Sequence, residues 1–325
     1  MPTGEHHPTT IGQPTNQTRI LSSRHLIITS LTPYLFLLPA LVALGLTVFW
    51  PALQAFYLSF TRYDAVDLTT APQWVGLFNL RRLWADQVFW LTMGNTFIYL
   101  MGVVPVLVTI PLGLAILVNR PLPGINSFRA AYYTPVIISM VVAGIAWRWL
   151  YAENGLLNQL ITGLGQVLPV SLSLPNIPWL TSPHLALFSV MVVTIWKGLG
   201  YYMVIYLAGL QAIPNELYEA AAIDGSDRWR KHWDITVPLM RPYMVLVAVI
   251  SAISATKVFE EVFVMTQGGP LNSSKTIVYY VYEQAFQDLE ISYACAIGLV
   301  LFFIILVLSV LRLVVFPTEA NQGMP

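Results

Sequence analysis

Six stretches of the sequence are long and apolar enough to cross a membrane as helices. No Asp, Glu, Lys or Arg occurs between Leu26 and Thr61 or between Gln87 and Asn119. A helix needs about 20 apolar residues to cross the hydrocarbon core, where it must satisfy its own backbone hydrogen bonds. The sequence therefore predicts an all-α polytopic membrane protein with six transmembrane helices, one in each of these intervals and four over about residues 130–151, 185–210, 241–265 and 291–316.

The composition excludes a soluble protein. Of the 325 residues, 56% are hydrophobic and only 10% are charged, which is too little polar surface to cover a soluble globule of this size. The 16 basic and 16 acidic side chains balance, so no overall field attracts a nucleic acid. We therefore expect a membrane protein that binds no nucleic acid.

The distribution of Lys and Arg predicts how the chain is oriented in the membrane. If the N-terminus lies inside, nine basic residues fall in cytoplasmic segments and four in outer loops. An excess of basic residues marks the cytoplasmic side, so both termini are predicted to be cytoplasmic. The predicted organisation is a disordered tail over 1–30, a transmembrane domain over 31–316 and a short tail over 317–325. The nine are Arg19, Arg24, Arg120, Arg129, Arg228, Arg230, Lys231, Arg241 and Arg312, and the four are Arg62, Arg81, Arg82 and Lys275.

The loop over residues 211–241 is predicted to hold two short helices joined at a glycine. Asn215 can cap the first helix, and Gly225 can take the left-handed conformation that ends it. Ser226 can then cap the second helix, which Pro238 is expected to stop. Trp and basic side chains around the second helix suit docking onto another protein. An amphipathic hairpin resting on the membrane surface is the alternative interpretation.

This loop resembles the signature loop of the integral membrane subunits of binding-protein-dependent ABC importers. That signature reads Glu-Ala-Ala, three residues, Gly and later Ile-x-x-Pro. Further segments from Leu31 onward resemble the carbohydrate branch of this family, which includes the permeases for maltose, lactose and glycerol phosphate. The signature positions are Glu219, Ala220, Ala221, Gly225, Ile235 and Pro238, and the further segments lie at 75–79, 133–135, 196–198, 266–270 and 282–286.

The resemblance implies a transport subunit of a bacterial-type inner membrane that carries a sugar or related polyol. Its implied partners are a second permease subunit, giving a heterodimer, two ATPase subunits and an extracytoplasmic solute-binding protein. The chain itself needs no cofactor, since ATP and Mg would be bound by the partner ATPase. Consistently, the sequence contains no G-x-x-x-x-G-K-[ST] phosphate loop. The resemblance implies that Glu219 and Gly225 lie at the turn that docks onto the ATPase. The residues implied to couple the chain to the ATPase are Glu219, Ala220, Ala221, Asp224, Gly225, Ile235 and Pro238.

Charged groups inside the predicted spans are candidates for a substrate pathway, because each is costly at membrane depth. Lys197 lies near the middle of its span, beside Trp196 and Tyr201, where aromatic faces could stack on a sugar ring. The alternative is a lysine that snorkels or pairs with a neighbouring chain.

A second charged group lies near the end of the fifth predicted span. Lys257, Glu260 and Glu261 are three and four residues apart and could pair along one helix face near the outer surface. Contact of these three side chains with substrate is the alternative.

Other functional classes find less support in the sequence. An ion-coupled secondary transporter would need carboxylates at the midplane of its spans, and we expect none there. An intramembrane enzyme would need a catalytic or metal-binding constellation, but His184 and Cys295 are isolated and no H-E-x-x-H occurs. An importer of a solute other than carbohydrate remains the main alternative.

Overall fold

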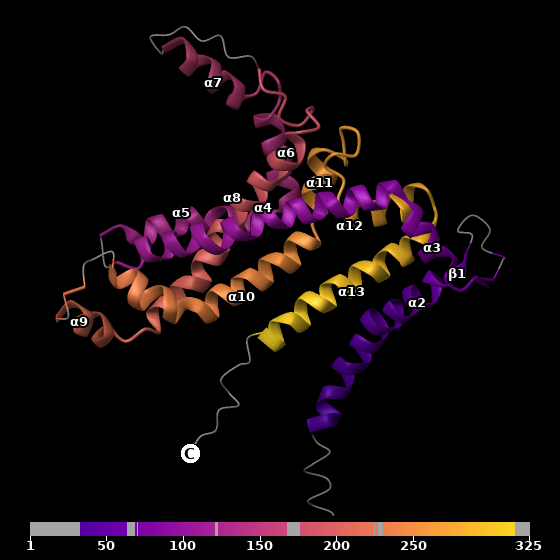
Figure 1. Ribbon diagram of the computed structural model, residues 1–325, viewed down its shortest axis with the longest axis horizontal. Coiled ribbons are helices and arrows are strands. Elements are labelled where there is room, and N and C mark those ends of the chain that lie inside the picture. Colours follow the sequence, from indigo (N-terminus) through magenta and orange to yellow (C-terminus); the bar gives the residue numbers. More distant parts are fainter. Residues whose placement is uncertain are drawn as a thin grey trace, which may run out of the picture. The chain divides into compact units, whose positions relative to one another are not determined.

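A computed structural model describes residues 33–63, 69, 71–120, 123–167, 176–223, 225–226 and 230–315 (Figure 1). The chain divides into two compact units, Met1–Tyr57 and Leu58–Pro325. The predicted tails over 1–30 and 317–325 lie outside the described residues. The described part is mostly helical, which agrees with the predicted all-α class.

The first candidate span is the helix Pro33–Ser59. It contains a π-helical turn, η1 (Gly45–Phe49), followed by α2 (Trp50–Ser59). The N–H of Trp50 donates to the carbonyl of Gly45, five residues earlier. Pro51 follows at once and has no N–H, and its ring would crowd the carbonyl four residues before it. We infer that the wider π turn accommodates this proline.

The second unit carries the remaining elements. Its two short strands pair antiparallel, with Thr61 opposite Trp74. The elements are β1 (Thr61–Arg62), β2 (Gln73–Trp74), α3 (Phe78–Ala85), α4 (Gln87–Val118), α5 (Ile125–Ile137), α6 (Met140–Leu150), α7 (Leu156–Val167), α8 (Ala186–Gln211), α9 (Asn215–Ile223), η2 (His232–Thr236), α10 (Val237–Thr256), α11 (Glu260–Met265), α12 (Ile277–Tyr282), η3 (Glu283–Gln287) and α13 (Ile291–Val315).

The core of this unit forms where α4, α8 and α10 pack along one another (Figure 1). Tyr206 of α8 is fully buried, and its hydroxyl donates to the carbonyl of Val108 in α4 at 2.9 Å. Helix α5 approaches α8 so closely that a Cβ at Gly200 would lie 2.1 Å from the carbonyl oxygen of Tyr132. Only glycine fits there, and this contact fixes the distance between the two helices.

Among the described residues, five helices are long and apolar enough to cross a membrane, and a bent pair raises the number to six if it forms one span. The five confirm the predicted apolar helices near the N-terminus, after residue 87, after 185, before 256 and after 291. They are Pro33–Ser59, Gln87–Val118, Ala186–Gln211, His232–Thr256 and Ile291–Val310.

The continuous helix predicted over 130–151 is wrong. The chain breaks at Ile138 and Ser139, whose ψ angles of 132° and 140° are extended, and α5 and α6 meet at 98°. Pro135 removes a backbone donor from the last turn of α5. The carbonyl of Ser139 then begins α6 by accepting from the N–H of Ala143 at 3.0 Å.

The helix predicted over 241–265 is wrong at both ends. It ends at Thr256, and residues 257–259 separate it from α11. It also begins earlier than predicted, because η2 runs directly into α10 and Pro238 lies in the first turn of α10 rather than ending a helix. As at Pro51, the proline comes two residues after a π-helical turn, here with the N–H of Val237 donating to the carbonyl of His232.

Candidate functional site

A cavity of about 330 Å³ lies between α4, α8 and α10. Its walls are largely apolar, with side chains such as Val103, Leu107 and Ile250. A small set of polar groups also faces this space, as is usual for a small-molecule site. The polar lining consists of Tyr99, Thr194, Lys197, Tyr201, Tyr202, Ser251, Ser254 and Glu261.

The ammonium group of Lys197 is bound within its own chain. Its Nζ donates to the carbonyl oxygen of Val136 at 3.2 Å. In a continuous helix, that carbonyl would accept from the N–H of Met140, but the break between α5 and α6 leaves it free. A cation is also favoured at the carboxyl end of a helix. Lys197 therefore caps the end of α5 while still lining the cavity.

Tyr99, Thr194 and Glu261, which also line the cavity, form a chain of hydrogen bonds. The hydroxyl of Thr194 donates to Oε1 of Glu261 at 3.2 Å and lies 2.5 Å from the hydroxyl of Tyr99. Because the single Thr194 proton points at Glu261, Tyr99 must donate to Thr194. The arrangement orients a carboxylate toward the same space as Lys197, so the cavity offers both charge signs to a polar solute.

The structure brings only some of the predicted pathway residues to this cavity. Lys197, Tyr201 and Glu261 line it, whereas Trp196, Lys257 and Glu260 do not. The ring of Trp196 instead meets that of Trp147, with centroids 5.5 Å apart.

The predicted pairing of Lys257 with both glutamates along one helix face is wrong. Lys257 follows the end of α10 while the glutamates begin α11, so the three do not share a helix. No salt bridge joins Lys257 to either glutamate in the part of the chain that the structure describes.

Sequence reasoning missed Tyr99, Thr194 and Ser254 as lining residues. None of them carries a charge, and hydroxyl side chains are scattered through all the spans. The one available signal was the run of polar residues Thr92, Asn95, Thr96 and Tyr99, which recurs every three or four positions and marks one buried face of α4.

The second candidate site is the loop that contains α9. Gly225 has a φ of +78°, which confirms its predicted left-handed conformation. The N–H of Ser226 donates to the carbonyl of Ala221 at 2.9 Å, and that of Gly225 to the carbonyl of Ala222 at 3.3 Å. These two bonds make a Schellman motif that ends α9. Asn215 is the first residue of α9 rather than the residue before it, and Asp224 lies outside the described residues.

Two side-chain contacts connect this loop to the start of the following span. The hydroxyl of Tyr218 lies 3.0 Å from that of Thr236 in η2. The hydroxyl of Ser226 donates to Oδ2 of Asp234 at 3.3 Å. These contacts link α9 and the turn after it to η2, which runs directly into α10. Glu219 and Ala220 are exposed on α9, and Ile223 is 87% exposed, so this surface is open to a partner.

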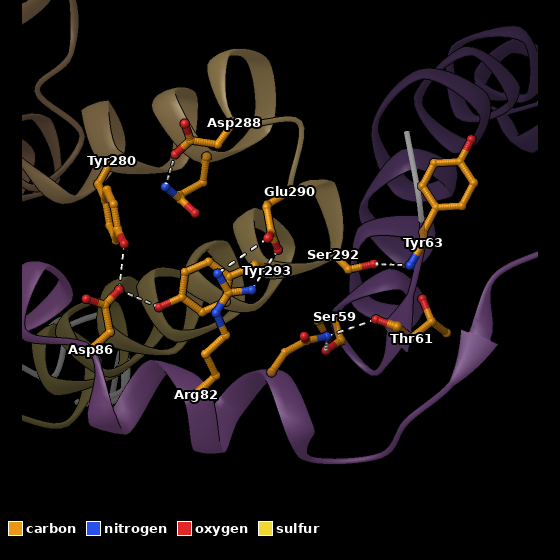
Figure 2. Close-up of polar contacts among 12 residues, drawn as sticks. Ser59, Thr61, Tyr63, Arg82, Asp86, Tyr280, Asp288, Glu290, Ser292 and Tyr293 are labelled. Atoms are coloured by element: carbon orange, nitrogen blue, oxygen red, sulfur yellow. Dashed lines mark hydrogen bonds and ion pairs between the residues drawn. The ribbon is translucent and has the colours of Figure 1, made fainter. Parts of the chain in front are cut away.

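A polar network at the other end of the fold joins α3 and α4 to α12 and α13 (Figure 2). Asp86 caps α4 by accepting from the N–H of Val88 at 2.8 Å. The same carboxylate accepts from the hydroxyls of Tyr280 and Tyr293, each at 2.5 Å. Arg82 donates to Glu290 at 2.6 Å and lies over the ring of Tyr293. One carboxylate thus holds three elements together.

Hydrogen bonding sets the charge state of Asp86. Burial by itself would raise the pKa of this carboxyl, but the two tyrosine hydroxyls and two backbone N–H groups outweigh burial and lower the pKa below its ordinary value of 3.8. The folded state therefore favours the carboxylate.

Replacing Asp86 is expected to lower stability in a pH-dependent way. Asp86→Ala removes the cap and leaves two hydroxyls unpaired, which costs about 2 kcal/mol or more. The stabilisation by Asp86 is complete above pH 3.8 and is lost as the pH falls through the lowered folded-state pKa. In detergent, the thermal unfolding temperature of the wild type should therefore fall more steeply below about pH 4 than that of Asp86→Ala. Equal slopes would contradict this role, and Asp288→Ala is the matched control.

Comparison with known proteins identifies the family. Residues 89–317, more than half of the chain, match the model of the family described as binding-protein-dependent transport system inner membrane component. The chain belongs to this family. The match covers the cavity helices α4, α8 and α10 as well as the α9 loop, and it confirms the resemblance that the loop signature indicated.

Known permeases are similar in sequence to this chain along most of their length. The permease is 33% identical over 285 residues to the arabinooligosaccharides transport system permease protein AraP of Halalkalibacterium halodurans, covering 86% of each chain. It is 32% identical over 283 residues to the lactose transport system permease protein LacF of Rhizobium radiobacter, covering 86% of this chain and 92% of LacF. The family consists of transport subunits of the inner membrane and not of enzymes.

A solved structure shares the fold. The permease superimposes on a chain of a bacterial alginate ABC transporter in complex with an alginate pentasaccharide-bound periplasmic protein, with a TM-score of 0.77 and 22% sequence identity. The alignment covers 92% of this permease and 98% of that chain. The fold that contains the bend between α5 and α6 is therefore shared with a chain of a solved transporter.

Proposed function

We propose that this permease is the membrane-spanning subunit of an ATP-driven importer for a sugar or related polyol that an external binding protein delivers. The observation that carries the proposal is the family match over residues 89–317 together with relatives named for arabinooligosaccharide and lactose transport. A relative named for sulfoquinovosyl glycerol transport, 30% identical over 288 residues, also supports a carbohydrate.

In this proposal the permease has six spans with both termini in the cytoplasm, and α5 and α6 together form the third span. The positive-inside distribution of Lys and Arg supports this orientation. It places the α9 loop in the cytoplasm and the Asp86 network at the outer surface. A second permease subunit would complete the pathway, two ATPase subunits would bind ATP and Mg, and the binding protein would dock outside.

The cavity between α4, α8 and α10 is the proposed solute pathway of this subunit. Its polar groups can both donate to and accept from sugar hydroxyls, with Lys197 and Tyr201 as donors and Glu261 as an acceptor. Trp196, Lys257 and Glu260 are not included, because they do not line the cavity.

The α9 loop is the proposed contact with the ATPase. Ala220 and Ala221 would present a small-residue surface beside Glu219 to a cleft in that partner, and Gly225 would hold the turn. Motion of the ATPase would then reach α10 through the contacts of Tyr218 and Ser226 with η2. Ile235 and Pro238 lie in this receiving segment rather than on α9.

An ion-coupled transporter is the alternative that one observation favours, since Glu261 places a carboxylate beside the cavity. Uptake of labelled sugars into proteoliposomes separates the two mechanisms. We expect uptake to require the partner ATPase with internal ATP and to persist when ion gradients are dissipated. Uptake that follows an ion gradient without ATP would overturn the proposed function.

A further inference from the structure

An apolar groove of about 710 Å³ lies at the end of the fold that carries the α9 loop. It runs along α4 and the start of α10, and it is separate from the cavity that holds Lys197. A Cβ added at Gly113 would meet nothing within 4 Å, so the floor of the groove is open there. Its apolar walls consist of Leu112, Ile116 and Leu117 from α4, and Val237 and Met244 from α10.

One end of this groove is polar. Arg120, His232 and Trp233 line it, and Arg120 follows the end of the apolar helix α4 by two residues. Among the described residues, the Arg120 guanidinium has no ion-pair partner. The acidic side chain nearest in sequence to Trp233, Asp234, already pairs with Arg230 at 3.6 Å. The groove therefore ends in a positive charge just beyond the C-terminal end of a candidate span.

We propose that this groove binds an anionic phospholipid, with an acyl chain along α4 and α10 and the phosphate at Arg120. The apolar walls belong to two candidate spans and include Leu117, which is 59% exposed. Trp233, 68% exposed, is a residue type favoured at headgroup level. Basic pockets between spans are suited to anionic headgroups. The charge of the rim thus complements a phosphate, and the apolar walls complement a hydrocarbon chain.

A lipid in this groove would contact the segment that receives motion from α9. His232 and Trp233 line the groove and belong to η2, the same π-helical turn whose Thr236 meets Tyr218. A bound phospholipid would therefore stabilise the packing of η2 against α4. Binding itself does not depend on which solute the permease carries.

The proposal is tested by measuring lipid retention with native mass spectrometry. The full-length permease, in its assembled complex, is reconstituted in nanodiscs of equal phosphatidylglycerol and phosphatidylcholine and then released. We expect phosphatidylglycerol to remain bound in preference to phosphatidylcholine. Arg120→Gln should reduce that retention about fivefold, the effect of one basic residue at a lipid surface. Gly113→Trp should abolish it by filling the groove.

Two matched variants control for charge and for size. Arg241→Gln removes an exposed basic residue near the same end of α10, and Gly94→Trp enlarges another open position of α4; both should retain phosphatidylglycerol as the wild type does. Equal retention in the wild type and Gly113→Trp would overturn the proposal. So would equal retention of the two lipids, or crosslinking of Gly113→Cys to a helix of the second permease subunit in the complex.

Discussion

Gly225→Pro is expected to abolish solute uptake while the permease still inserts in the membrane. The φ of Gly225 is +78°, whereas proline is held near −65°, so the turn that ends α9 cannot form. The bonds from Gly225 and Ser226 back to the last turn of α9 would be lost with it. Because α9 is the proposed contact with the ATPase, the substitution should also weaken copurification of that partner.

A conservative variant tests whether the left-handed conformation at position 225, rather than glycine itself, is what uptake requires. Asn tolerates the left-handed conformation better than other residues that have a Cβ, so Gly225→Asn should retain much of the uptake. Glu219→Lys should abolish uptake by changing the contact surface of α9. Uptake at the wild-type level in both Gly225→Pro and Glu219→Lys would show that the loop does not couple the two proteins.

The second large effect is expected at the cavity. Lys197→Met should reduce the rate of uptake about tenfold or more, because it leaves the carbonyl of Val136 unpaired and removes a cation from the proposed pathway. Association with the ATPase should not change, since Lys197 lies fourteen residues, about 21 Å of helix, before the end of α8 that leads to the α9 loop. Uptake and ATPase copurification, measured on the same membranes, check both statements.

Two variants sharpen this test. Lys257→Met removes the same charge from a lysine outside the cavity and should transport normally. Glu261→Gln keeps the shape of the side chain but breaks the charge balance of the cavity, and we expect its loss of uptake to resemble that of Lys197→Met. If Lys197→Met transports at the wild-type rate, the cavity is not the solute pathway of this subunit.

The sequence predicts the apolar spans well, because the length of an apolar segment can be read from consecutive residues. It does not predict where they break. Near the bend at Ile138 and Ser139, α5 packs closely against Gly200, and Lys197, about sixty residues away in sequence, donates to the end of α5. Such contacts between distant residues cannot be read from the sequence. Pro238 was expected to end a helix, but a π turn before it lets the helix continue into α10.

The two sites differ in how far the sequence alone predicts them. The α9 loop is continuous in sequence, so its helix and its glycine turn could be predicted from residues 215–225 alone. The cavity draws its lining from α4, α5, α8, α10 and α11, and only its charged members stand out in an apolar sequence. Tyr99 and Thr194 become candidates only once the helices are packed and their hydroxyls are found in contact.

The most direct test of the proposed function is the ATPase rate of the purified assembly. The permease is coexpressed with a second permease subunit and the ATPase encoded beside it, and hydrolysis is measured with the cognate binding protein and a panel of sugars. We predict a stable four-chain core whose hydrolysis rises when one sugar-loaded binding protein is added. A permease that purifies alone and carries solute without ATP would contradict the account.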